Sequence, residues 1–128
     1  DQPRSRGLGD VYKRQIYMYP QNTCLESDWK LFQKRVPVWQ ERYVGRLMEE
    51  YRAILDSEES SSEKFWALEK RIRQDKKSLG VIVDMRRSTV QVELLQMLLQ
   101  GVIQPSDLEG FSQELRDSLT FIMQIYSG

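Results

Sequence analysis

Apolar side chains recur every three or four residues through much of the first half of the chain. The stripe follows Ser27 and consists of Trp29, Phe32, Val36, Trp39, Tyr43, Leu47, Tyr51 and Ile54. At 3.6 residues per turn, this spacing places all of these side chains on one side of an α-helix. A long amphipathic helix must bury that side, so the rest of the chain has to cover it. Pro37 lies inside the stripe and lacks a backbone donor, which predicts a kink or a break near Val36.

A second helix is predicted after the acidic, serine-rich stretch 56–63, DSEESSSE. Ser60 and Glu63 have the spacing of a capping box, in which each residue satisfies a backbone N–H of the other. The apolar positions of this helix are Phe65, Leu68, Ile72 and Leu79. Gly80 is the type of residue that ends a helix.

Two more helical segments follow. One begins between Asp84 and Ser88 and ends at Gly101, after the extended connector 81–83. The other follows Pro105, and glycine at position 110 divides it into a short turn and a longer helix. The prediction is an all-α fold, a compact bundle of four main helices. Its predicted core combines side chains from all four: Trp39, Leu47, Phe65, Leu68, Ile72, Leu95, Leu98, Leu115 and Leu119.

The N-terminal residues are treated separately. Residues 5–15, SRGLGDVYKRQ, resemble the in-frame translation of a transposase-type sequencing adaptor, because back-translation restores such an adaptor codon for codon. Processing and adaptor-derived segments are set aside before the fold is considered. We therefore interpret residues 1–15 as a tail outside the fold, 16–26 as an irregular segment and 27–128 as a single helical domain.

The composition argues against catalysis. The chain contains no histidine and one cysteine, Cys24. Histidine is the commonest general base and metal ligand, so its absence removes the usual triads and zinc sites. We expect a non-enzymatic protein with no catalytic residues, no metal and no cofactor. No stretch approaches the roughly 18 apolar residues of a membrane span, and a lone cysteine is typical of a reducing compartment, so we expect a cytoplasmic location.

Charge is distributed unevenly. Residues 64–87 contain eight cations and three acids, a net charge of +5, whereas the other residues after position 15 contain seven cations and fourteen acids, a net charge of −7. A basic segment on an acidic body indicates a surface for an acidic partner. The predicted binding residues share this segment and are Trp66, Lys70, Arg71, Arg73, Lys77, Arg86 and Arg87. Four of them fall on the side of the helix roughly opposite its apolar face: Trp66, Lys70, Arg73 and Lys77.

Several functions remain open at this point. The first is a helical module whose basic face binds an acidic protein or another copy of the chain. The second is binding of a phosphorylated small ligand or nucleotide, with Trp66 stacking beside the cations. The third, disfavoured by the acidic C-terminal segment, is DNA binding through a helix-turn-helix. The same face can also be simply solvated, with Glu69–Arg73 and Arg71–Asp75 pairing one turn apart, and Trp66 can pack on another helix.

Four motifs of the chain also resemble a known group of proteins. They are WKLFQKRVPVWQERY, SEKFWALEKRIRQDKKS, GVIVDMRRS and GVIQPSDLEGFSQEL, within residues 29–119. They are similar to small bacterial proteins, mostly from Firmicutes, which automatic labels sometimes call multidrug transporters. The resemblance implies one compact helical domain and no particular mechanism. A transporter is at odds with the absence of an apolar stretch long enough to cross a bilayer.

Overall fold

The structure, a computed structural model, describes residues 24–127. Within that range it contains four α-helices, two 3-10 helices and no strand, which confirms the all-α prediction. The elements in chain order are α2 (Glu26–Leu55), α3 (Ser61–Asp75), η2 (Arg87–Thr89), α4 (Val90–Leu99), η3 (Pro105–Leu108) and α5 (Gln113–Ser127). The adaptor-like residues 1–15 and most of the predicted irregular segment 16–26 lie outside the described residues.

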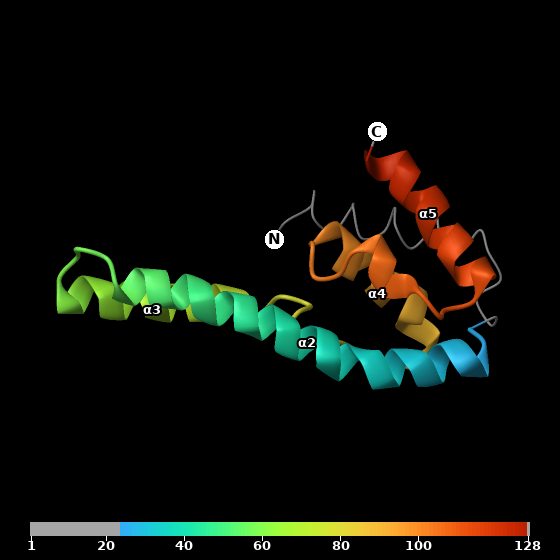
Figure 1. Cartoon of the computed structure of the whole chain (residues 1–128), viewed down its shortest axis with the longest axis horizontal. Helices are drawn as coiled ribbons and strands as arrows, with labels where there is room; N and C mark the ends of the chain where they lie inside the picture. The colour runs from blue at the N-terminus through green and yellow to red at the C-terminus, as the bar shows by residue number, and fades with distance from the viewer. Residues whose placement is uncertain (1–23, 128) are drawn as a thin grey trace.

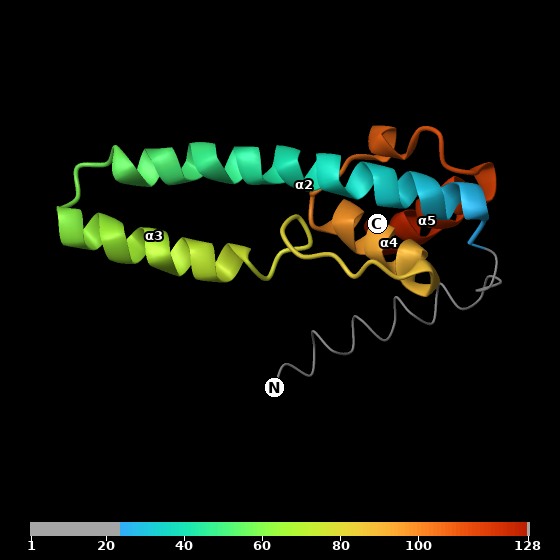
Figure 2. The same ribbon diagram turned by 90° about the horizontal axis from the view of Figure 1, so that it is seen from below.

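Helix α2 runs along the whole molecule and belongs to two regions (Figure 1). Helices α4 and α5 pack on its N-terminal half, while α3 lies antiparallel beside its C-terminal half (Figure 2). We call the first region the head; it consists of residues 26–43 and 79–127. The second region, residues 44–78, is the arm. The loop between α2 and α3 forms the tip of the arm, far from α4 and α5.

The hydrophobic core lies in the head. One cluster of buried residues joins the N-terminal half of α2 to α4, η3 and α5. Its members are Phe32, Val36, Trp39, Val90, Leu94, Leu95, Met97, Leu98, Val102, Ile103, Leu108, Phe111, Leu115, Leu119 and Ile122. The predicted core positions Trp39, Leu95, Leu98, Leu115 and Leu119 are confirmed here, and Leu47 is buried where the arm begins.

Polar contacts fix the connecting segments onto α2. Arg42 forms a two-pronged ion pair with the Asp107 carboxylate, at 2.9 and 3.0 Å. Arg35 donates to two backbone carbonyls of the same loop. The buried Asp28 carboxylate accepts hydrogen bonds from the backbone N–H and the hydroxyl of Ser112, at 2.8 and 2.6 Å. It thereby holds the residue that precedes α5 against the start of α2.

The first helix is not broken at Pro37. Helix α2 is continuous from Glu26 to Leu55, so a split near Val36 is wrong, and a kink there is not confirmed. Pro37 itself is exposed. The helix also begins one residue before the predicted cap Ser27, because Leu25 occupies the N-cap position without a side-chain hydrogen bond.

Gly80 has a different role from the one predicted. Helix α3 ends at Asp75, before the glycine, and Gly80 instead lies directly against the ring of Tyr43. A Cβ atom at this position would lie 2.1 Å from the Tyr43 ring, so only glycine fits without a shift. By contrast, Gly101 follows α4 with a φ of 76°, as expected of a residue that ends a helix.

Candidate functional site

Helix α3 begins where the sequence predicts it. The Ser60 side chain accepts a hydrogen bond from the Glu63 backbone N–H at 3.2 Å, and the Glu63 carboxylate accepts one from the Ser60 N–H at 3.0 Å. These hydrogen bonds lower the pKa of Glu63. The capping box is confirmed, yet the helix that it starts contains no buried residue.

The predicted core positions on α3 are therefore largely wrong. Phe65 exposes 62 % of its surface and Ile72 39 %, while Leu68 is half-buried. The physical reason is the position of α3, which lies along the end of α2 that extends away from α4 and α5 (Figure 1). Its apolar face meets one neighbouring helix, and one helix cannot enclose it.

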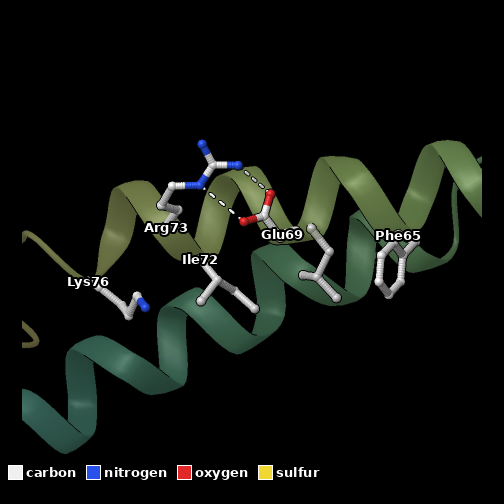
Figure 3. Close-up of a pocket in the computed structure, with 6 residues that line it drawn as sticks. Phe65, Glu69, Ile72, Arg73 and Lys76 are labelled. Atoms are coloured by element: carbon white, nitrogen blue, oxygen red, sulfur yellow. Dashed lines mark hydrogen bonds and ion pairs between the residues drawn. The ribbon is translucent and has the colours of Figure 1, made fainter.

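An open apolar groove runs along the arm as a consequence. One part has a volume of about 310 Å³ and is lined by Phe65, Leu68, Glu69, Ile72, Arg73 and Lys76. An adjoining part of about 180 Å³ is lined by Val44, Leu47, Met48, Tyr51, Ile72, Asp75, Lys76 and Val81. Figure 3 shows Phe65 and Ile72 on the α3 side of this groove, with Lys76 at one end. We refer to the two parts together as the arm groove.

Two aromatic rings pack against each other on α3, and one of them, Phe65, lines the groove. Phe65 and Trp66 form an edge-to-face pair, with centroids 4.9 Å apart and planes at 87°. Trp66 exposes 63 % of its surface, so no other helix of the described residues covers it. Of the two alternatives for this tryptophan, packing on another helix or exposure, the structure shows exposure.

The cations on α3 divide into two groups. Lys70 of α3 and Lys77 are exposed and form no ion pair with any described residue. Lys77 lies two residues past the end of α3, so its predicted position on the helix is wrong. Arg73 pairs with Glu69 one turn away, at 3.0 Å from Nε to Oε2 (Figure 3). The hydrogen bond from Arg73 lowers the pKa of Glu69. The expected Glu69–Arg73 pair is thus present, and it leaves two lysines of this face without a neutralising acid.

The Arg71 side chain lies on the side of α3 that faces α2 and attaches the two helices to each other. Its guanidinium pairs with Glu50 and lies 3.4 Å from Asp75, as the i,i+4 spacing predicts. It also lies over the Tyr51 ring, 5.6 Å from the centroid. Tyr51 donates a 2.6 Å hydrogen bond to Asp75, and burial together with this bond raises the pKa of Tyr51 to about 12. Arg71 therefore holds the arm together and does not belong to the exposed basic face.

The Arg86–Arg87 pair lies elsewhere. Arg87 donates to the Cys24 carbonyl at 2.7 Å and pairs with Glu26 at 2.6 Å, at the start of α2. Arg71 meets α2 at Glu50, twenty-four residues further along, so the two points at which Arg87 and Arg71 contact α2 are about 36 Å apart at 1.5 Å per residue. Arg86 pairs with Asp84. The expectation that both arginines add to the face of α3 is wrong, because the connector leads back to the head.

The described residues include no cluster of three or more His, Cys, Asp or Glu side chains that could hold a metal ion. Cys24 is half-buried beside Arg87, and burial raises the pKa of its thiol, which is opposite to the activation of a nucleophile. No helix of the described residues is long and apolar enough to cross a bilayer. The feature of the arm that distinguishes it chemically is an apolar groove beside unneutralised lysines.

Sequence reasoning missed Val44 and Met48 on the α2 side of the groove, whereas Leu47 and Tyr51 belong to the predicted stripe. Val44, Met48 and Leu55 lie beside the predicted stripe, and Met48 and Leu55 expose 49 % and 50 % of their surface. With Tyr51 they follow spacings of four, three and four residues, which is a second apolar stripe on the same helix. That spacing was the available signal.

Comparisons with known proteins add nothing to these findings, since neither a family model, nor a curated protein, nor a solved structure matches the chain.

Proposed function

We propose that this protein is a non-enzymatic helical interaction module that binds an acidic protein surface through its arm. The observation that carries the proposal is the exposed Phe65–Trp66 pair beside Lys70 and Lys77. Contiguous apolar surface flanked by charge is typical of protein interfaces, where aromatic residues are enriched. The cytoplasm remains its predicted location, on the basis of a single cysteine.

The two kinds of side chain contribute differently to binding. Burial of the aromatic rings supplies affinity, because a few large desolvated side chains carry most of the binding energy of an interface. Lys70 and Lys77 select for an acidic partner and increase its association rate. Arg71 acts indirectly by fixing α3 on Glu50. Arg73 retains donors but is already neutralised by Glu69.

A small phosphorylated ligand is less well supported by the same geometry. Such a ligand requires several donors that converge on one group. Of the predicted donors, Arg71 faces Glu50, Arg86 faces Asp84 and Arg87 faces Glu26. The lysines that remain, Lys70 and Lys77, are seven residues apart in the sequence, and Lys77 lies beyond the end of α3. An extended acidic surface fits this arrangement better than a compact anion.

Site-specific photo-cross-linking in the producing cell tests the proposal. A photoreactive amino acid at Ser62, one turn before Trp66 on the same exposed face, should give a discrete protein adduct. The same probe at Gln33, which is exposed on the head, should not. Reversing charge with Lys70→Glu and Lys77→Glu should abolish the Ser62 adduct, whereas Lys34→Glu, an exposed lysine of the head, should leave it unchanged.

All of these variants should remain folded, because exposed charges contribute only about 0–1 kcal/mol to stability. Circular dichroism and thermal melting check this. An adduct of equal yield from Ser62 and Gln33, or one that survives charge reversal at both lysines, would contradict an acidic partner on the arm.

A further inference from the structure

The side of α2 that faces away from the core carries a regular stripe of exposed residues. In Figure 1, α4 and α5 lie above α2 and no described helix lies below it. Positions at alternating spacings of three and four residues follow this side of the helix, roughly opposite the buried Trp39 and Leu47. We call these positions the back stripe. All six are exposed, and they are Val38, Glu41, Gly45, Met48, Arg52 and Leu55.

Three members of the back stripe are apolar side chains with much of their surface in water. Val38 exposes 64 %, Met48 49 % and Leu55 50 %. Met48 also reaches the edge of the arm groove, whereas Val38 and Leu55 do not line it. Alternating spacings of three and four residues are those with which two α-helices pack along their length. The back stripe therefore has the periodicity of a contact between helices.

Gly45, near the centre of the back stripe, is not explained by packing within the chain. Glycine is unfavourable in the interior of a helix. A Cβ atom at this position would meet no atom within 4 Å, so no neighbour in the molecule requires a glycine here. The absence of a side chain does allow another helix to approach closely.

The back stripe is complementary to itself when its direction is reversed. Its positions form three pairs that share one midpoint, between residues 46 and 47: 38 with 55, 41 with 52, and 45 with 48. Two antiparallel helices related by a two-fold axis at this midpoint place the members of each pair opposite each other. Valine then meets leucine, glycine meets methionine, and the Glu41 carboxylate meets the Arg52 guanidinium.

We propose that two copies of this chain associate antiparallel through the back stripes of their α2 helices, with the two-fold axis between residues 46 and 47. Each of the three pairs forms twice, once on either side of the axis. The inference goes beyond the proposed function, because it uses a different face of the molecule and leaves the Phe65–Trp66 pair of each arm exposed.

Charge selects this orientation and this register. A parallel pair of helices in register would place Glu41 against Glu41 and Arg52 against Arg52, and like charges across an interface are unfavourable. If the antiparallel pair slides by seven residues in one direction, the exposed Lys34 faces Arg52. If it slides by seven residues in the other direction, Arg52 faces Met48 and has no acid opposite.

The ends of the contact agree with the same register. The tip of the arm, residues 56–59, contains three acids and no cation. In the proposed pair it comes beside residues 34–37 of the other copy, close to the exposed Lys30 and Lys34. Lys34 forms no ion pair with a described residue, so the acidic tip supplies a counter-charge that its own chain does not.

The dimer should be weak. A standard interface buries about 800 Å² on each partner, and a single pair of helices buries less. Ion pairs at an interface fix orientation and register more than they add affinity. We therefore expect a dissociation constant in the micromolar to millimolar range.

Sedimentation equilibrium of the purified full chain, over concentrations up to about 1 mM, is the primary test. We expect a monomer–dimer equilibrium. Val38→Glu and Met48→Glu should each weaken dimerisation by about 10-fold or more, because each places two unpaired charges in the interface. Ile82→Glu is the matched control, since Ile82 is 62 % exposed outside the back stripe and its substitution should leave the dimer intact. A chain that is monomeric throughout this range overturns the inference, as does an equal effect of Ile82→Glu.

A charge swap tests the register. Glu41→Arg and Arg52→Glu should each weaken the dimer by about 10-fold or more, because each places like charges opposite one another. The double variant restores opposite charges and should dimerise within about threefold of the wild type, as expected of a coupled pair. All of these positions are exposed, and circular dichroism verifies that the variants are folded. No recovery in the double variant, or no effect of either single change, contradicts the pairing.

Cross-linking tests the antiparallel orientation. In a Cys24→Ser background, Val38→Cys and Leu55→Cys each provide a single thiol. An equal mixture treated with a short bismaleimide should give a covalent dimer that contains one copy of each variant. Neither variant alone should become linked, because the two copies of either position are seventeen residues, or about 25 Å, apart along the helices. Self-linking of either variant, or no link in the mixture, overturns the arrangement.

The inference and the proposed function fail independently. Charge reversal at Lys70 and Lys77, which lie outside the back stripe, should leave the dimer intact, and loss of the dimer in that variant would overturn the inference. Val38→Glu should disrupt the dimer and keep the Ser62 adduct with an acidic protein. Gln33, the control position for that adduct, lies about 100° around α2 from Lys34 and outside the back stripe.

Discussion

The head and the arm share one helix, yet they use it differently. In the head, Phe32, Val36 and Trp39 of α2 are almost completely buried by α4 and α5. In the arm, α3 is the helix that packs on α2. No residue of α3 becomes buried there, and Met48 and Leu55 of α2 remain about half exposed. Both regions have helical apolar periodicity in the sequence. The comparison teaches that periodicity identifies the side of a helix that seeks a partner, whereas burial depends on how many elements lie opposite.

The largest expected difference between the regions comes from truncating a leucine in each. Leu94 in the head is fully buried and Leu55 in the arm is half exposed. Leu94→Ala should destabilise the protein by about 2–5 kcal/mol, the range for a buried leucine. Leu55→Ala should cost less than about 1 kcal/mol, as for a surface position. Urea denaturation measures both, and equal losses would abolish the distinction between head and arm.

A polar contact should have the next largest effect in the head. Asp28→Ala removes the acceptor for both the backbone N–H and the hydroxyl of Ser112. Because the carboxylate is buried, we expect a loss of about 1.5–3 kcal/mol in the free energy of unfolding. Glu26→Ala is the control, since it breaks an exposed ion pair with Arg87 that is worth about 0–1 kcal/mol. A smaller effect at Asp28 than at Glu26 would show that the polar contacts of the head do not depend on burial.

The junction between the regions can be tested with two glycines. Gly80→Ala places a Cβ atom against the Tyr43 ring and should destabilise by about 1–3 kcal/mol through overpacking. Gly45→Ala, in the arm, meets no atom within 4 Å and should stabilise α2 by up to about 1 kcal/mol. If Gly80→Ala is neutral, the head and the arm are not closely packed at Tyr43. Combining Gly80→Ala with Tyr43→Ala should cost less than the sum of the two single changes.

The smallest expected effect is a pH dependence of opposite sign in the two regions. Burial raises the pKa of Glu93 in the head, where its carboxylate accepts a 3.4 Å hydrogen bond from the Asp84 N–H. Its contribution to stability is therefore present below its unfolded pKa and is lost as the pH rises through the folded value. The pKa of Glu63 in the arm is lowered, so its contribution is lost as the pH falls through the folded value.

Urea denaturation of the wild type, Glu93→Gln and Glu63→Gln separates the two contributions. The measurements run from pH 3 to pH 8, a range that spans the ordinary carboxyl pKa of about 4. Relative to Glu93→Gln, the wild type should lose stability as the pH rises. Relative to Glu63→Gln, it should gain stability over the acidic part of the range. The same sign for both residues would contradict the burial of Glu93 or the capping role of Glu63.

Local signals predicted the helices well. The Ser60–Glu63 capping box, the glycine after α4 and the i,i+4 pairs of α3 depend on residues within one turn of each other. Sequence reasoning failed where a residue's partner is distant in the chain. Arg87 pairs with Glu26 sixty-one positions away, and Gly80 fits against Tyr43, so neither role follows from local spacing.

By itself, the sequence determined the all-α class and the helical faces that carry apolar residues, because both depend on spacing along a helix. It also determined that residues 64–87 are basic, because that depends on composition alone. The tertiary structure alone decided which of those faces is covered. It placed α4 and α5 over one half of α2 and left Phe65 and Trp66 exposed on the other. It also separated Arg71 from Lys70, neighbours in sequence, by directing one toward Glu50 and the other to the surface. Burial and pairing are properties of what lies opposite a side chain, and only the folded chain specifies that.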